Sequence, residues 1–135
     1  MSNARSRARG ITLIELLVAM AIVAILMSIA VPAYQRYVRR GHRSAAQAAM
    51  MDIADRQQQI LLANRNYVDA AELAATGYSP PPEVSAHYTY TVTLGAGTIP
   101  SFLITFTPTG SQVSDGPLTL DHRGNKTPVD KWQGR

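Results

Sequence analysis

The feature that most constrains this chain is an apolar run near its N-terminus. Residues 16–34 contain no charged side chain, and this stretch is about as long as the ~20 residues that cross a membrane as a helix. Glu15 stands at the beginning of the run. A lone carboxylate at such a place costs roughly 2.5–3.5 kcal/mol on insertion scales, because hydrocarbon cannot solvate it. The sequence therefore requires a partner for Glu15.

A short basic leader precedes the apolar run. Arg5, Arg7 and Arg9 lie before Gly10, and without them ten basic residues face nine acidic ones. The formal net charge of +4 is therefore largely a property of the leader and does not by itself indicate nucleic-acid binding. A second basic cluster follows the run, so the distribution of charge does not fix an orientation across a membrane; it consists of Arg36, Arg39, Arg40 and Arg43.

The apolar run differs from a cleaved secretory signal. Such a signal ends in a junction of small residues, whereas here Pro32 and a polar helical pattern follow. We therefore expect the run to be retained. The chain contains no cysteine, which excludes a disulfide framework and any thiolate metal or redox site.

Residues 11–64 predict one long helix. In its apolar part, residues 11–38, Pro32 has no N–H to give the carbonyl of Ser28, so we expect a kink or a local opening there, and Gly41 is a second soft point. Residues 44–64 continue as an amphipathic helix, with an apolar stripe on one face and the glutamines at 57–59 facing elsewhere. The stripe needs a sheet to cover it.

The second half of the chain reads as a connection followed by short strands. Residues 69–72 form a capping-box pattern that predicts a short helix stopped by Gly77, and residues 79–82, Ser-Pro-Pro-Pro, predict an extended linker. Residues 88–94 alternate strictly and predict a half-buried strand whose threonines face water. Further strands are expected at 102–107 and 118–120, after which residues 124–125 (Gly-Asn) turn the chain toward residues 126–127. The predicted class is α+β, a long N-terminal helix packed on a small antiparallel sheet.

The sequence contains no catalytic constellation, and it predicts no cofactor and no metal site. Three histidines fall on different predicted elements, and three aspartates read as ordinary loop acids: His42, His87, His122, Asp115, Asp121 and Asp130. Basic residues gather near the C-terminus beside Trp132, at Arg123, Lys126, Lys131 and Arg135, which could suit DNA. Because acids interleave them, a solvated loop is favoured and nucleic acid is not an expected partner.

The ordered N-terminal motif carries a family resemblance. The basic leader, Gly10, residues 12–15 (Thr-Leu-Ile-Glu), the apolar helix, Pro32 and Tyr34 resemble the class III signal and N-terminal helix of type IV pilins. The chain looks most similar to small minor pilins of the PilE type. The resemblance is strong at the N-terminus and looser beyond residue 64, and it implies the pilin fold.

The resemblance implies roles for four positions. A prepilin peptidase would cut after Gly10 and methylate the new amine of Ile11, although the family more often has phenylalanine at that position. Glu15 would pair with the Ile11 amine of a neighbouring subunit and set the register of a helical filament. Within one chain, Glu15 can also cap its own helix together with Thr12. Pro32 would let the helix adjust when subunits leave the membrane.

The family often closes its C-terminal region with a disulfide. Here Lys131 precedes Trp132 where the second cysteine would stand, and no cysteine lies near residues 116–117. How the C-terminal loop is held is therefore left open by the sequence.

The expected organisation is a cleaved leader at residues 1–10, a transmembrane and filament-core helix at 11–38, and a soluble headgroup at 39–135. Within the headgroup we expect the amphipathic helix at 39–64, a connection at 65–87, and the sheet with its C-terminal loop at 88–135. The resemblance implies a non-enzymatic subunit of a type IV pilus, with a role in pilus biogenesis, motility or adhesion. The small headgroup favours a minor subunit.

The implied partners are the prepilin peptidase, other major and minor pilins, the inner-membrane assembly platform, and the membrane itself before assembly. The subunit would first be a single-pass inner-membrane protein with a periplasmic headgroup, and would then join an extracellular pilus. Two alternatives stay open: a pseudopilin of type II secretion, and a DNA-binding competence pilin.

Overall fold

The computed structural model describes residues 10–134. One helix, α1, runs from Leu13 to Asn64 without interruption at Pro32 or Gly41. The chain forms two compact units that divide within α1, between Tyr37 and Val38. The long helix and the sheet described below confirm the predicted α+β class.

The described part of the first unit is an uncovered apolar helix. Every residue from 10 to 37 is exposed, and Leu13, for example, keeps 78% of its surface open. An 18-residue window of α1 has a mean hydropathy of 2.7, which makes the helix long and apolar enough to cross a membrane. Such a surface requires lipid or protein around it, because water cannot cover it favourably.

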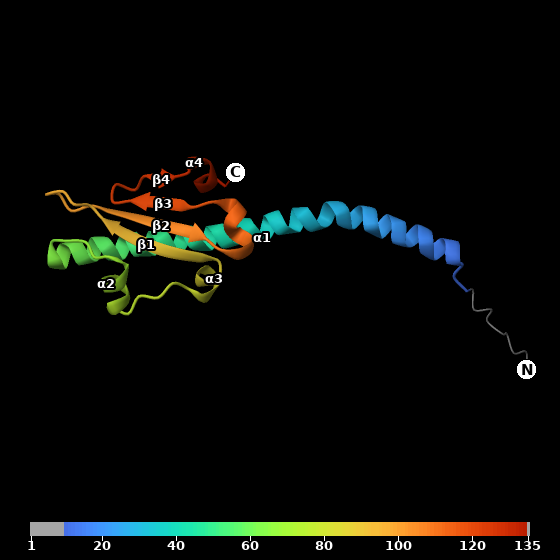
Figure 1. Ribbon diagram of the computed structural model, residues 1–135, viewed down its shortest axis with the longest axis horizontal. Helices are drawn as coiled ribbons and strands as arrows, with labels where there is room; N and C mark the ends of the chain where they lie inside the picture. Colours follow the sequence, from blue (N-terminus) through green and yellow to red (C-terminus); the bar gives the residue numbers. More distant parts are fainter. Residues whose placement is uncertain (1–9, 135) are drawn as a thin grey trace, which may run out of the picture. The chain divides into compact units, whose positions relative to one another are not determined.

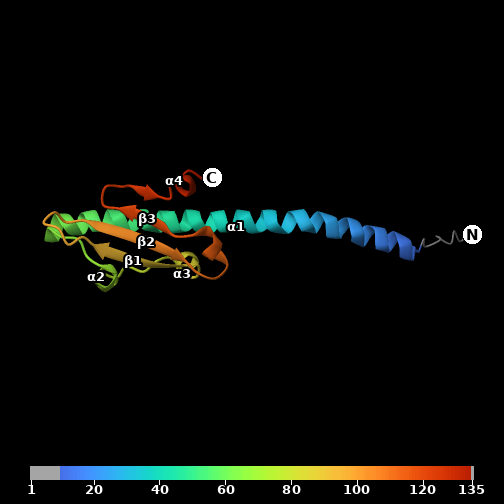
Figure 2. The ribbon, with the colours of Figure 1, turned by 45° about the horizontal axis from the view of Figure 1, so that its top comes forward.

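The second unit contains a four-stranded antiparallel sheet. Its strands are β1 (Tyr88–Leu94), β2 (Phe102–Pro108), β3 (Leu118–Asp121) and β4 (Lys126–Thr127), paired in chain order. The C-terminal part of α1 lies along the sheet (Figures 1 and 2). The first three strands therefore occupy the predicted positions, and β1 leaves Thr89, Thr91 and Thr93 exposed, as its alternation predicts.

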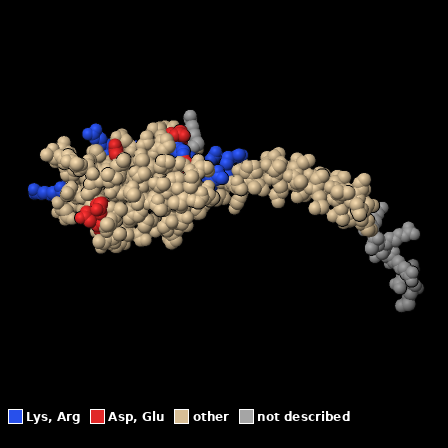
Figure 3. Space-filling model, in the orientation of Figure 1, with Lys and Arg blue, Asp and Glu red and all other residues tan. Residues whose placement is uncertain are grey.

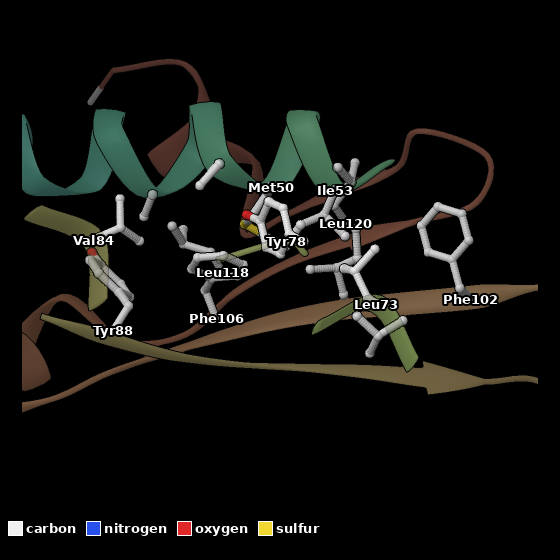
Figure 4. Packing of buried hydrophobic residues seen from close by; sticks show 14 of the residues in the cluster. Met50, Ile53, Leu73, Tyr78, Val84, Tyr88, Phe102, Phe106, Leu118 and Leu120 are labelled. Carbon is white, nitrogen blue, oxygen red and sulfur yellow. The ribbon is translucent and has the colours of Figure 1, made fainter. Parts of the chain in front are cut away.

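The core lies between the sheet and α1. Met50 and Ile53 on α1 are fully buried and face apolar side chains of all three longer strands (Figure 4). Burying a side chain of this size stabilises the fold by about 1.5–3 kcal/mol. The remaining core residues share this layer or come from the connection: Ala46, Ala49, Tyr67, Leu73, Tyr78, Val84, Tyr88, Val92, Phe102, Ile104, Phe106, Leu118 and Leu120.

The connection between α1 and β1 contains two short helices. Helix α2 (Ala70–Ala75) begins with the predicted capping box, in which Asp69 accepts from the Glu72 N–H at 2.9 Å and Glu72 accepts from the Asp69 N–H at 3.2 Å. Gly77 follows with φ +89°, a conformation that suits glycine. The predicted extended linker reaches only Pro81, because Pro82 begins helix α3 (Pro82–Ser85), a position where proline is favourable.

Two further short elements were not expected from the sequence. A 3₁₀ helix, η1 (Gly110–Asp115), joins β2 to β3, and helix α4 (Val129–Trp132) follows β4. Gln47 of α1 donates from Nε2 to the carbonyl of Lys131 at 3.1 Å. This bond helps to hold the C-terminal segment in a chain without disulfides.

The expectation that residues 57–59 face away from the core is wrong for Gln57. This side chain is fully buried, and its Nε2 donates to the carbonyl of Val68 at 2.6 Å while its Oε1 accepts from the Val68 N–H at 3.0 Å. The side-chain amide satisfies both backbone groups of Val68, as a neighbouring strand would. Gln57 therefore fastens the start of the connection to α1.

Candidate functional site

The candidate processing site lies just before α1. Gly10 and Ile11 are exposed, and a Cβ added to Gly10 would find no atom within 4 Å. The peptide bond between them is therefore open to a large partner. The leader arginines and the rest of residues 1–9 lie outside the described residues.

Glu15 has a local partner at the start of α1. Its N–H donates to Thr12 Oγ1 at 3.3 Å, and the Thr12 N–H donates to Glu15 Oε2 at 3.4 Å. This reciprocal arrangement satisfies two of the N–H groups that a helix start leaves without partners, and the carboxylate also lies at the favourable end of the helix dipole. The capping role of Glu15 within one chain is confirmed. Its pairing with a neighbouring subunit stays a prediction.

Pro32 lies inside α1, which is helical on both sides of it. One turn earlier, Ser28 donates from its hydroxyl to the carbonyl of Ile25 at 2.7 Å. The kink predicted at Pro32, and its use during assembly, stay predictions.

A polar cluster joins α1 to η1 and β1 in the second unit. Arg43 and Asp115 form a buried bidentate ion pair, through Arg43 Nη2 to Asp115 Oδ1 and Arg43 Nε to Asp115 Oδ2, the latter at 2.8 Å. Gln112 donates from Nε2 to Tyr88 Oη at 3.0 Å and also to the carbonyl of Arg39 at 3.0 Å. Asp115 is only 7% exposed, so its prediction as an ordinary loop acid is wrong.

The charges of this cluster stabilise one another. Burial by itself raises the pKa of Asp115, but the hydrogen bond and positive charge of Arg43 outweigh burial, and the pKa of Asp115 lies below its ordinary value. Burial raises the pKa of Tyr88 to about 12. The cluster therefore holds an ionised carboxylate and a neutral phenol at neutral pH.

Two of the histidines also meet here, which corrects the expectation that they are scattered. The rings of His42 and His87 stack with centroids 3.7 Å apart, and His42 Nδ1 lies 3.3 Å from Gln112 Oε1. His122 lies elsewhere, and its ring meets the ring of Phe102 in a T-shaped arrangement with centroids 6.3 Å apart. Nothing in the local sequence signals this meeting, because residues 42, 87 and 112 are brought together only by the fold.

The C-terminal basic residues form a separate group. Lys126 Nζ lies 4.9 Å from the ring centroid of Trp132, a cation–π contact, while Arg135 is outside the described residues. Asp121 accepts hydrogen bonds from the Asn125 side chain and from the backbone of Arg123 and Asn125. Although the small burial at this site raises the pKa of Asp121, these bonds lower it more, so the carboxylate beside the basic group stays ionised. Within residues 10–134, no group of three His, Asp or Glu side chains could hold a metal ion.

An uncovered apolar helix with a capped carboxylate at its start, followed by a small antiparallel sheet, defines the class of type IV pilins. A family model for the prokaryotic N-terminal methylation motif matches residues 5–31. A second model, described as "Type IV minor pilin ComP, DNA uptake sequence receptor", matches residues 32–120, which is more than half of the chain. The chain therefore belongs to this family of minor type IV pilins, and the resemblance inferred from its N-terminal motif is confirmed.

Two curated proteins are similar to the chain. It is 32% identical over 97 residues to "Type IV major pilin protein PilA" of Myxococcus xanthus (strain DK1622), an alignment that covers 72% of this chain and 42% of that protein. It is 38% identical over 73 residues to "Fimbrial protein" of Moraxella nonliquefaciens, covering 51% of this chain and 45% of that protein. The chain thus spans less than half the length of either relative.

Proposed function

We propose that this protein is a minor structural subunit of a type IV pilus, matured by cleavage after Gly10 and by methylation of the Ile11 amine. The observation that carries the proposal is the uncovered apolar helix with Glu15 at its start. The helix surface is unfavourable in water, the carboxylate is costly in any apolar surrounding that covers the helix, and a filament supplies partners for both. The methylation-motif match at residues 5–31 supports the processing step. In this role the protein performs no catalysis.

In the proposed assembly, Glu15 exchanges its own cap for the Ile11 amine of a neighbouring subunit. A staggered carboxylate–amine pair inside an apolar bundle offsets a cost that an unpaired charge would impose on every subunit. Repeated head-to-tail contacts of this kind give an open helical filament. The proposed partners are a prepilin peptidase, other pilins and the inner-membrane assembly platform.

Before assembly, the proposed state is a single membrane span, with the headgroup on the periplasmic side and the filament later outside the cell. The family match and both relatives carry pilin or fimbrial names, which favours a pilus over a type II secretion pseudopilus.

The test combines processing with assembly in cells that produce the whole chain. Intact-mass analysis should show loss of residues 1–10 and gain of one methyl group. Glu15→Leu should still be cleaved but should be absent from sheared filaments, whereas Thr12→Val, which removes the hydroxyl from the cap but keeps the carboxylate, should assemble. An uncut chain, or filaments containing Glu15→Leu at the normal level, would overturn the proposal.

A second candidate function is DNA reception, because the matched family is described as a DNA uptake sequence receptor. The residues available for it include the exposed Arg123 and Lys126, and Lys126 lies over the ring of the half-buried Trp132. Cations there would contact phosphates, and aromatic rings can stack on bases.

Duplex DNA titrated against the full chain in non-ionic detergent tests this function. Binding should weaken as salt rises, and Arg123→Gln with Lys126→Gln should weaken it further, while the exposed Arg65→Gln should have little effect. If no DNA is retained at low salt, the second function is excluded.

A further inference from the structure

A small basic pocket lies between α1 and α4 in the second unit. Its volume is about 210 Å³, and it is lined by Arg40, Arg43, Ser44, Gln47, Lys131 and Gly134. The α1 residues recur at three- and four-residue spacing, so they share one face of that helix. Basic side chains gather where this unit begins, on the face that Figure 3 shows.

The pocket is built by fixed contacts. The bond from Gln47 to the Lys131 carbonyl brings α4 against α1, and Asp115 holds the Arg43 guanidinium. A Cβ at Gly116 would lie 3.1 Å from Lys131 Nζ, so the glycine leaves room for the ammonium. Gly116 and Lys131 stand near the two positions where the resembled family often has a disulfide, and here they place a cation.

The charge of the pocket is positive. Three cations line it, and no carboxylate is among its lining residues. Because Arg43 is already paired with Asp115, Arg40 and Lys131 supply the positive charge of the lining. Like charges held this close repel one another unless an anion lies between them. The Ser44 hydroxyl and the Gln47 amide add polar groups for its oxygens.

The size of the pocket limits the ligand. About 210 Å³ is several times the ~30 Å³ that one water occupies, yet it is below the ~300–1,000 Å³ typical of pockets for drug-sized molecules. A phosphate group with a short linking segment fits this range.

The position along the chain indicates the source of the phosphate. Arg40 lies only six positions after Tyr34, the end of the charge-free run, which is about 9 Å along a helix. The headgroup layers add about 10–15 Å to the ~30 Å hydrocarbon core, which is about 5–8 Å on each side. A pocket that begins at Arg40 is therefore tethered near the outer edge of one headgroup layer.

We propose that the pocket between α1 and α4 binds the phosphate group of an anionic phospholipid and so seats the subunit on the membrane before assembly. An anionic headgroup matches the excess of cations, whereas a zwitterionic one would bring an ammonium group toward Arg40 and Lys131. The inference rests on the membrane-inserted stage of the proposed function, but not on cleavage, methylation or filament register.

The test uses the full chain in a non-ionic detergent, titrated with short-chain phosphatidylglycerol, short-chain phosphatidylcholine or inorganic phosphate at constant ionic strength. Trp132, the single tryptophan of the chain, follows Lys131 and reports binding through its emission, with the thermal unfolding midpoint as a second readout. Phosphatidylglycerol should give a saturable response at concentrations where the other two ligands give none. Arg40→Gln and Lys131→Gln should each weaken that response about tenfold.

Arg36→Gln is the matched control, because it removes an exposed arginine near the pocket that does not line it. It should change the affinity by less than about twofold. Equal losses of phosphatidylglycerol affinity in Arg36→Gln and Arg40→Gln would overturn the proposal, because they would indicate a general electrostatic attraction between the basic cluster and the anionic lipid. So would an equal response to inorganic phosphate, displacement of the lipid by duplex DNA, or silence of both readouts. None of these results would alter the mass or assembly test of the pilus proposal.

Discussion

At the scale of single residues, the Arg43–Asp115 pair connects two distant parts of the headgroup sequence. The two residues are 72 positions apart in sequence, and their side chains are 12% and 6% exposed. With one partner removed, the other charge would lose a buried, hydrogen-bonded counter-ion, which is more costly than the loss of a surface pair. The pair thus joins α1 to the segment between β2 and β3.

We predict that Asp115→Ala lowers the free energy of unfolding by about 3 kcal/mol, because it leaves the Arg43 guanidinium without its carboxylate. Thermal or denaturant unfolding of the full chain in non-ionic detergent measures this change. Asp52→Ala is the control, since Asp52 pairs with Arg56 on the exposed surface at 3.1 Å and should contribute less than about 1 kcal/mol. Equal, small losses in both variants would show that the buried pair adds little.

The stability that Asp115 provides should also depend on pH. Its pKa in the folded chain lies below the unfolded value of about 3.9, so its contribution is complete above about pH 4 and is lost as the pH falls through the folded pKa. The difference in stability between the natural chain and Asp115→Asn should therefore be constant from pH 7 to about pH 5 and should shrink in stronger acid. A difference that already vanishes near pH 6 would contradict this assignment.

At the scale of elements, Gln57 decides how the connection begins. We predict that Gln57→Ala costs about 2–4 kcal/mol, because both backbone groups of Val68 lose their buried partner. Gln59→Ala, two residues on and exposed, should change the stability by less than about 0.5 kcal/mol. Amide exchange at Val68 should become faster in the first variant only; protection at Val68 that survives Gln57→Ala would disprove the role given to this side chain.

The elements that depend on local pattern were predictable. Helical spacing from residue 44 onward, strict alternation in β1 and the capping box of α2 each fix their structure through near neighbours in the sequence. Gln57, η1 and α4 were missed for the opposite reason. Gln57 reads as a solvated residue in a run of three because its partner, Val68, contacts it only in the folded chain. Asp115 reads as a loop acid because its partner, Arg43, is 72 positions away in the sequence.

The candidate site divides in the same way. The motif from Gly10 to Glu15 is contiguous, so its pattern predicted the cap that the structure contains, and its resemblance to pilins supplied the roles that stay predictions. The basic pocket combines Arg40 with Lys131, ninety-one positions later, and no spacing rule predicts that meeting.

At the scale of the whole molecule, two buried tyrosines make the headgroup sensitive to alkali. Burial raises the pKa of Tyr78 and of Tyr88 to about 12, above the ordinary value of 10. Because the folded pKa is the higher one, the stability linked to each phenol is complete below about pH 10 and is lost as the pH rises toward 12.

We therefore predict that the unfolding midpoint of the full chain falls steeply above pH 10. Tyrosinate absorbance from the core should rise over the same pH range. Tyr78 Oη has no hydrogen-bond partner among residues 10–134, so Tyr78→Phe should reduce the alkaline loss without weakening the fold at pH 7. Tyr88→Phe should also reduce the alkaline loss but should weaken the neutral fold, because Tyr88 Oη accepts from Gln112. An unfolding midpoint that is flat between pH 9 and 12 would refute the prediction.

The two hydrogen bonds between Thr12 and Glu15 have a consequence for the timing of assembly under the proposed function. An uncleaved chain has no free amine at Ile11, and its carboxylate is already occupied within its own first turn. Such a chain gains little from stacking against a neighbour. The cap would therefore delay assembly until processing. Uncleaved chains would stay monomeric in the membrane, because only a cleaved neighbour offers the Glu15 carboxylate a charged amine in place of its own cap.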